Sequence, residues 1–557
     1  MPDGFFDAPT SLAAGAVAAT GVAVALRRGR EQVESQGVAL AGLTAAFVFA
    51  AQMVNVPIAA GTSGHVLGGV LAAVLVGPWV AVLCLTVVVT VQCLLFADGG
   101  LSALGVNVVN MALVTCLGGW LVFRGVRSVL PRSLPSTRAV PVAAGIAAGS
   151  SVVLASVAFT AEYALGGTTD VSVGTVLAAM VGVHTVIGLG EGVVTGLLVA
   201  AVLAARPDLV AGARAGDEPP ADGRRRLVPG VAVAGAGLGT ALLIAACAAP
   251  FASTAPDGLE RVAADHGLHA TGTAVIGSAV VGDGGIGRLA GVAVVLGLAV
   301  LVVAATAAGA GRRRGERPRA LADLPAHVKV VAALAFVLGV VATPRTAVPV
   351  FVLDAVVVAF VAHRAGLALP ALVRRLAVEL PFVAFALLLP FLAGGPDVAV
   401  GPLSLSVAGL WSAWGVLAKA TLGVAVAVVL THTTPPGDLV GGLQRLRVPG
   451  PLVAIGAFMV RYGAVLSAEV ERLRIARVSR GDDPRWLWQA RSVATTGGAL
   501  FVRSFERGER VQLAMAARGF DGRWPTSGAA ALPVDWAPAA AFAAVAVTGA
   551  ALALGMG

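Results

Sequence analysis

Apolar runs of about 20 residues recur from one end of the 557-residue chain to the other, and they constrain its fold more than any other feature. A run of this length can cross a lipid bilayer as a helix. The runs lie near 9–26, 37–56, 65–77, 79–96, 105–123, 139–161, 174–205, 229–250, 287–309, 328–343, 346–362, 378–394, 408–431 and 536–554. Only 12% of the residues are charged, whereas soluble proteins carry about 25%. The sequence therefore predicts an all-α polytopic membrane protein with about 14 transmembrane helices.

Arginines gather in the short loops between these runs, and their positions predict the topology. Arg27, Arg28 and Arg30 follow the first run, and a second basic group lies within 124–138. Basic loops stay on the cytoplasmic side, so the N-terminus is expected outside, in a multi-pass protein of the bacterial cytoplasmic membrane. Because the arginines flank membrane spans, the net charge of +9 does not indicate a nucleic-acid partner.

The predicted helices fall into three modules. Residues 1–206 form the first, and residues 207–228, rich in Pro, Gly and charged side chains, form a cytoplasmic linker. Residues 229–310 form a module of two spans with an outer segment at 251–286. Residues 320–557 form the third module, in which the charged stretch at about 460–525 is expected to lie in the cytoplasm.

A histidine in a glycine-rich turn is the strongest candidate for a binding residue. His65 stands in Gly61-Thr62-Ser63-Gly64-His65-Val66-Leu67-Gly68-Gly69, and the topology places it on the outer side with Met1. A neutral imidazole is a ligand for Ni²⁺, Co²⁺, Cu²⁺ and Zn²⁺. The α-amine of Met1, once deprotonated, would add a second nitrogen in a small planar site suited to Ni²⁺ or Cu²⁺. The alternative is that His65 is a hydrogen-bonded histidine at the membrane interface.

Polar side chains within the predicted spans are further candidates, because such residues are costly in lipid. They are Asn55, Gln92, Asn107, Asn110, His184 and Glu191. His184 and Glu191 are seven residues apart and share a helix face, so we expect them to support a metal ligand or the helix packing. For each of the six, an interhelical hydrogen bond is the alternative to metal contact.

Two charged helices are predicted in the cytoplasmic stretch, ending at Arg480-Gly481 and at Arg518-Gly519. In the second helix Phe501 and Phe505 form an i,i+4 apolar pair, and Glu506 is spaced to pair with Arg510. The repeated Arg-Gly end predicts a duplicated docking device, with the arginine free to bind a partner carboxylate. The alternative is a pair of solvated helices beside the membrane.

Sequence patterns of common enzymes do not occur in the chain. It contains no GxxxxGK[ST] sequence, and its two lysines are Lys329 and Lys419. It also contains no HExxH. We therefore expect a non-enzymatic protein without an ATPase site of its own.

Taken in order, these motifs resemble those of cobalt/nickel energy-coupling-factor (ECF) transporters. Residues 1–205 resemble the CbiM/NikM substrate-binding component, residues 229–309 the two-span PDGLE (CbiN-like) partner, and residues 320–557 the CbiQ-type transmembrane coupling component. The matching stretches are Pro2 to Phe5, Phe47 to Met53, Gly61 to His65, Asp98 to Gly100, Asn107 to Asn110, Gly188 to Gly192, Pro256 to Glu260, Glu379 to Phe382, Thr433 to Pro435, Phe501 to Ser504 and the two Arg-Gly ends.

The resemblance implies a membrane permease for Co²⁺ or Ni²⁺ with its parts fused in one chain. The metal is cargo rather than a permanent cofactor, and it would be held by the N-terminal amine, an adjacent histidine and the histidine matching His65. Two separate ATP-binding-cassette ATPase subunits would bind the coupling helices at Arg480-Gly481 and Arg518-Gly519. Their ATP-driven closure would release the metal inward.

The N-terminus departs from the family pattern. The family begins Met-His-x-Pro-Asp-Gly, whereas this chain begins Met1-Pro2-Asp3-Gly4 and lacks the second-position histidine. Pro2 has no N–H that could be deprotonated to bind a metal. We therefore expect that the start was assigned two codons late, so that Met1 matches the family's third residue.

Two other functions stay open from the sequence. A gradient-driven secondary metal carrier would need paired carboxylates within the membrane, for which Asp354 and Glu191 are the main candidates. An ECF component for an organic micronutrient would need an aromatic pocket, whereas aromatic residues make up 5% of the chain. The choice between cobalt and nickel is also open, because both accept imidazole and amine nitrogen.

Overall fold

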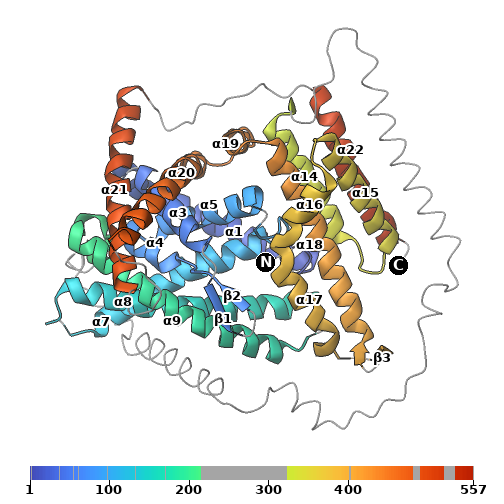
Figure 1. Ribbon diagram of the computed structural model, residues 1–557, viewed down its shortest axis with the longest axis horizontal. Coiled ribbons are helices and arrows are strands. Elements are labelled where there is room, and N and C mark those ends of the chain that lie inside the picture. The colour runs from blue at the N-terminus through green and yellow to red at the C-terminus, as the bar shows by residue number, and fades with distance from the viewer. Residues whose placement is uncertain are drawn as a thin grey trace, which may run out of the picture.

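The computed structural model describes residues 1–214 and 323–555, except 2, 37, 54–55, 60–61, 97, 132, 170, 395, 401–402, 481–489 and 520–532 (Figure 1). The predicted all-helical membrane fold is confirmed: eight helices of the described residues are long and apolar enough to cross a bilayer, or nine if one bent pair counts as a span. The predicted spans 229–250 and 287–309, the Pro256 to Glu260 motif, Asn55 and Gly481 lie outside the described residues.

Residues 1–214, here called the first helical group, appear in blue and green in Figure 1. The elements are α1 (Ala8–Arg28), α2 (Arg30–Gln36), α3 (Val38–Gln52), β1 (Val56–Ala59), β2 (Thr62–Gly64), α4 (Gly69–Val76), α5 (Pro78–Phe96), α6 (Leu104–Val108), the π-helix η1 (Val109–Gly118), α7 (Gly119–Val129), α8 (Ser136–Gly166), α9 (Val173–Ala205), η2 (Pro207–Leu209) and α10 (Ala211–Arg214). Strands β1 and β2 pair as an antiparallel hairpin.

Local sequence sets the ends of the long helices. The Asp7 carboxylate caps α1 by accepting from the amide of Thr10 at 2.8 Å, and the helix ends in Arg27 and Arg28. Ser172 caps α9 in the same way through Thr175. A side-chain acceptor at this position satisfies an amide that the helix itself leaves free.

Helices α8 and α9 touch backbone to backbone. A Cβ placed on Gly149 would lie 2.9 Å from the carbonyl oxygen of Gly188, and one placed on Gly188 would lie 2.7 Å from that of Gly149. Gly145 and Gly192 form a second such pair one turn away. Close approach through small residues is how helices associate strongly in lipid, where burial of apolar surface gives no driving force.

Helix α4 is too short to be the predicted third span. Its eight residues cover only about 12 Å. It ends at Gly77 (φ +81°), where an added Cβ would lie 2.8 Å from Oε1 of Gln32, beside the basic end of α1. Contrary to our prediction, residues 65–77 therefore do not form a helix long enough to cross a hydrocarbon core of about 30 Å.

Residues 323–555, here called the second helical group, appear in yellow to red in Figure 1. The elements are α14 (Ala326–Ala342), α15 (Val348–Arg364), α16 (Leu369–Arg375), η5 (Leu376–Glu379), α17 (Leu380–Leu392), the hairpin β3 (Asp397–Val400) and β4 (Leu403–Ser406), α18 (Val407–Thr433), α19 (Pro436–Arg445), α20 (Gly450–Val478), α21 (Ala490–Ala517) and α22 (Pro533–Gly555). Helices α15 and α16 meet at 113°.

Helices α20 and α21 cross over to the first helical group and share its core (Figure 1). Helix α20 packs along α3, where an added Cβ on Gly42 would contact Phe458. It starts well before the charged stretch that we predicted, because its first half is apolar and buries Ile455, Phe458 and Met459. By length and composition α20 qualifies as a candidate membrane span.

Helix α21 packs against both α3 and α9. The ring of Phe501 meets that of Phe47 edge-on at 5.6 Å. A Cβ on Gly497 would lie 2.9 Å from the Leu198 side chain, and one on Gly498 would lie 2.6 Å from Cβ of Ala201. Glycines thus let α21 approach the end of α9 closely.

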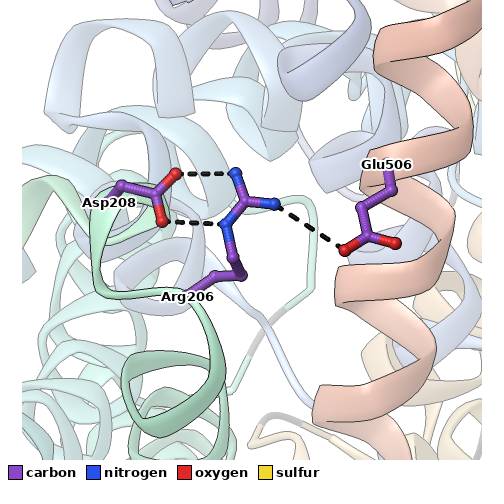
Figure 2. A network of polar contacts seen from close by, with 3 residues as sticks. All are labelled: Arg206, Asp208 and Glu506. Carbon is purple, nitrogen blue, oxygen red and sulfur yellow. Dashed lines mark hydrogen bonds and ion pairs between the residues drawn. The ribbon is translucent and has the colours of Figure 1, made fainter.

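A polar contact follows directly after this helix crossing (Figure 2). Arg206, at the end of α9, donates through Nε and Nη2 to the Asp208 carboxylate at 2.9 and 2.7 Å. Its Nη1 lies 3.8 Å from Oε1 of Glu506, and its guanidinium lies 5.6 Å from the ring centre of Phe505. Glu506, which we expected to pair with Arg510 along its own helix, therefore reaches across to the first helical group.

Candidate metal centre

His65 occupies the connection between β2 and α4. Its side chain is partly exposed, and Nδ1 lies 3.2 Å from the carbonyl oxygen of Val66. Gly68, three residues later, caps α4 with φ +75°, a conformation that glycine adopts without strain. An added Cβ there would also lie 2.8 Å from Cγ1 of Val48. The turn therefore depends on glycine both for its backbone angle and for its fit against α3.

Glu191 fixes this turn from α9. Its Oε2 accepts from the amide of Leu67 at 2.7 Å, and its Oε1 accepts from the amide of Gly68 at 2.8 Å. The carboxylate is 1% exposed. Charge-assisted hydrogen bonds of this kind are among the stronger polar contacts in proteins. Glu191 thus satisfies two amides at the start of α4 and places His65 relative to α9.

Two glutamines hold the turn from the other side. The Gln52 side chain, at the end of α3, donates to the carbonyl oxygen of Leu67 at 2.6 Å. The Gln92 side chain, on α5, donates to Oε1 of Gln52 at 2.7 Å. The turn that carries His65 is therefore tied to α3, α5 and α9 by buried hydrogen bonds. Gln52 was not among our candidate residues, although its place in an apolar helix marked it in the same way as Gln92.

The N-terminus is held by the loop between α5 and α6. The Met1 amine donates to Oδ1 of Asn107 at 3.3 Å, and the Met1 carbonyl accepts from the amide of Gly100 at 2.7 Å. Oδ1 of Asp3 accepts from both the amide and the hydroxyl of Ser102, at 2.7 and 2.6 Å. Asp3 was also missing from our candidates, because nothing in the sequence shows that it is buried.

Burial changes the proton affinity of this segment. It lowers the pKa of the Met1 amine below its usual value of 8.0, although nearby Asp98 acts in the opposite direction. It raises the pKa of Asp3, against the effect of the Ser102 hydrogen bonds. A lowered pKa favours the neutral amine, which is the form that binds a metal ion.

The remaining predicted residues lie around these two anchors. His184 Nδ1 lies 2.8 Å from the Met180 carbonyl oxygen, one turn earlier in α9. Asn110 donates to Oε2 of Glu162 at 2.5 Å.

The Met1 amine and His65, the two proposed metal ligands, have different hydrogen-bond partners. No group of three or more His, Cys, Asp or Glu side chains among the described residues is placed to hold a metal. A site made from one imidazole and one amine needs no such group.

The two hydrogen bonds that Glu191 accepts from the His65 turn, here called the Glu191 clamp, lead to a direct test. In Glu191→Gln one backbone amide would face the NH₂ group and lose its acceptor, at a cost of about 1–3 kcal/mol. We expect the affinity for Ni²⁺ to fall about 10- to 100-fold, as is typical when a ligand loses its supporting contact. Equilibrium dialysis of the purified chain measures this. The control is Glu162→Gln on α8, whose carboxylate accepts from a side chain that can rotate. Equal affinities for wild type and Glu191→Gln would show that the clamp does not position a ligand.

The predicted docking ends of the two charged helices are described in part. Helix α21 ends at Ala517, and exposed Arg518 is followed by Gly519 with φ +81°, the left-handed conformation that closes many helices. Helix α20 ends at Val478, shortly before exposed Arg480.

Comparison with known proteins agrees with this arrangement. Residues 1–209 match the family model of CbiM, described as a cobalt uptake substrate-specific transmembrane region, and residues 318–527 match that of CbiQ, a cobalt transport protein. A putative metal transport protein of Haloquadratum walsbyi is 38% identical over 38% of this chain and 92% of its own length.

Two further relatives are fused proteins. A putative fused nickel transport protein NikMN of Archaeoglobus fulgidus is 37% identical over 38% of this chain and 67% of its own length. A putative fused cobalt transport protein CbiMQ of Methanocorpusculum labreanum is 24% identical over 90% of both chains. With its CbiM match followed by its CbiQ match, the chain belongs to the family of fused cobalt and nickel transport proteins of the CbiMQ and NikMN type.

Proposed function

We propose that this chain is the membrane permease of an ECF-type ABC importer for Co²⁺ or Ni²⁺, driven by two separate ATPase subunits. One observation carries the proposal. Helices α20 and α21, which lead to exposed Arg480 and Arg518, pack on α3 and α9. Those two helices carry Gln52 and Glu191, which hold the His65 turn. A displacement of α20 or α21 would therefore reach the metal turn through two packed helices.

In this proposal the ion enters from the outer face of a cytoplasmic membrane and is bound by the imidazole of His65 and the N-terminal amine. That amine belongs to Met1 in this sequence, and to a residue two positions before Met1 if translation starts two codons earlier. ATP-driven closure of the partner subunits displaces α20 and α21. The close packing of Gly497 and Gly498 against α9 makes α9 follow α21, and Arg206 contacts Glu506 and Phe505 at the end of this packing. An exposed ion pair of this kind contributes only about 0–1 kcal/mol, so it sets the alignment of the two helices rather than their stability. The glutamate on α9 then no longer holds the turn, and the ion leaves inward.

A gradient-driven carrier is the alternative function from a different class. Both carboxylate oxygens of Asp354, buried in α15, have no hydrogen-bond partner among the described residues. A proton or sodium relay needs a chain of such groups. Glu191, the other candidate carboxylate, is bound to two backbone amides.

Uptake into proteoliposomes separates these functions. The full chain is reconstituted with and without the ATPase subunits encoded in the same genome, and uptake of radioactive Ni²⁺ and Co²⁺ is measured with ATP on the ATPase side. We expect uptake only with both ATP and ATPase, and no uptake from an imposed H⁺ or Na⁺ gradient alone. Uptake driven by a gradient without ATPase would instead establish the carrier. Binding of a vitamin with no binding of metal would establish the organic-substrate alternative.

A further inference from the structure

The N-terminal segment has a second contact surface, which belongs to the second helical group. Gly4 (φ +77°) lies directly on the side chain of Lys419 in α18, since an added Cβ would lie 2.7 Å from Cβ of Lys419 and 3.1 Å from its Cγ. One turn further along α18, an added Cβ on Gly423 would contact Oδ2 of Asp3 and lie 3.0 Å from its Cγ. Figure 1 accordingly places the N-terminus beside α18.

Asp3 bridges the two helical groups with its two carboxylate oxygens. Oδ1 takes both hydrogen bonds from Ser102 in the first group, while Oδ2 faces Gly423 in the second. The residue is 3% exposed. The absence of a side chain at Gly423 is what leaves room for this carboxylate.

The side chain of Lys419, against which Gly4 packs, is itself held in position. Its ammonium group donates to the carbonyl oxygen of Val341 at 2.8 Å, which ties its aliphatic stem to the end of α14. On the opposite side the hydroxyl of Thr168 donates to the Gly4 carbonyl at 2.8 Å. Gly4 is therefore held between the loop after α8 and the second helical group.

The distance along the chain makes this contact relevant to the metal. Asp3 is only two residues from Met1, whose amine is the proposed second ligand beside His65. Two residues span at most about 7 Å, so the position of Asp3 limits where the Met1 amine can lie. Ligand groups must be held within about 0.5 Å of their working positions for full effect.

We propose that α18 completes the metal site. Lys419 and Gly423 act as positioning residues that hold Asp3 and Gly4 in place. Movement of α18 removes these contacts and thereby lowers the affinity for the metal. The inference rests on the proposed function, because it takes the Met1 amine as a ligand. It adds a second route from the CbiQ part to the metal, separate from the route through α20, α21 and the His65 turn.

The test is the affinity of the purified full chain for Ni²⁺ by equilibrium dialysis, comparing wild type with Gly423→Ala. The new methyl group collides with the Asp3 carboxylate, and we expect the affinity to fall about tenfold or more. The matched control is Gly415→Ala on the same helix, where an added Cβ would meet only the Arg345 side chain, at 3.0 Å. Wild-type affinity is expected for this control.

A double variant distinguishes positioning from general damage. Asp3→Ser keeps an oxygen near Ser102 and removes the carboxylate oxygen that faces Gly423. Adding Gly423→Ala to Asp3→Ser is therefore expected to change the affinity less than threefold, far less than in the wild-type background. In addition, Lys419→Met retains an apolar stem under Gly4 and should bind more tightly than Lys419→Ala, which removes it; this comparison holds even if Gly423→Ala does not fold.

The outcomes separate the inference from the proposed function. If Gly423→Ala and Lys419→Ala bind Ni²⁺ like wild type while His65→Ala does not bind, the inference is wrong and the proposed function stands. Additive effects of Gly423→Ala and Asp3→Ser would also overturn the inference. If wild type binds neither Ni²⁺ nor Co²⁺, the proposed function fails and the inference with it.

Discussion

His65→Ala is expected to abolish tight binding of Ni²⁺ and Co²⁺ while leaving the fold intact. The imidazole is the one side-chain ligand in the proposed site, so its loss should exceed the 10- to 100-fold effect of losing a supporting contact. The fold should tolerate the change because the one polar contact of the ring among the described residues is with the carbonyl of the next residue, at 3.2 Å. The hydrogen bonds that hold the turn come from Gln52 and Glu191 and involve main-chain groups. Isothermal titration with each metal, together with the unfolding temperature, measures both effects.

His432→Ala is the matched control, since His432 is an exposed histidine at the end of α18. It should bind like wild type. Unchanged metal binding by His65→Ala would place the ion elsewhere, and His184→Ala would then be the next variant to test. A form with Met-His added before Met1 belongs in the same series. The family pattern predicts that it binds more tightly, whereas equal binding would remove the missing histidine from the ligand set.

Gly188→Leu is expected to prevent α8 and α9 from packing. Its Cβ alone would lie 2.7 Å from the carbonyl oxygen of Gly149, and that atom belongs to the backbone and cannot rotate away. A leucine would force the two helices apart, which we expect to cost about 3 kcal/mol or more. The separation would also withdraw Glu191, three residues further along α9, from the His65 turn. The yield of monodisperse protein and the unfolding temperature in detergent should both fall sharply.

The control stands two residues away on the same helix. Gly190 is exposed, and an added Cβ there has no neighbouring atom within 4 Å. Gly190→Leu should therefore fold and bind metal like wild type, although its change in size and hydropathy is the same. If yield and unfolding temperature fall to a similar extent in both variants, the effect comes from replacing a glycine within α9 itself and not from its contact with α8.

Long apolar runs made much of the fold predictable. The runs at 79–96 and 174–205 became α5 and α9 almost residue for residue, because each is a single uninterrupted helix. The run at 65–77 misled us for a physical reason: apolar residues buried inside a helical group have the composition of a membrane span without its length. The β1–β2 hairpin before it could not be predicted, since its pairing depends on the helices that flank it.

The candidate site was predictable in some of its members, since Gln52 and Asp3 were missed, and not in its connections. Glu191 was recognisable as a costly polar residue in a span, whereas its partners, two main-chain amides more than 120 residues earlier, have no sequence signal. Their meeting depends on the glycine contacts that set the register of α8 and α9. The same holds for Asp3 and Gly423, which are 420 residues apart in the sequence and meet only when the two helical groups assemble.

The shortness of α4 has an electrical consequence for the bound ion. In the predicted topology, with the basic end of α1 at the cytoplasmic boundary of a core about 30 Å thick, a helix about 12 Å long would put the His65 turn roughly halfway across that core. A divalent cation that reaches this depth from outside has moved two charges through roughly half of the membrane potential, which is worth about 2.3 kcal/mol per 100 mV. At about 100 mV, negative inside, this would raise the apparent affinity of the site by roughly 40-fold before any ATP is consumed. The membrane potential would favour binding of the metal from outside, and ATP hydrolysis would be needed only to release it inward.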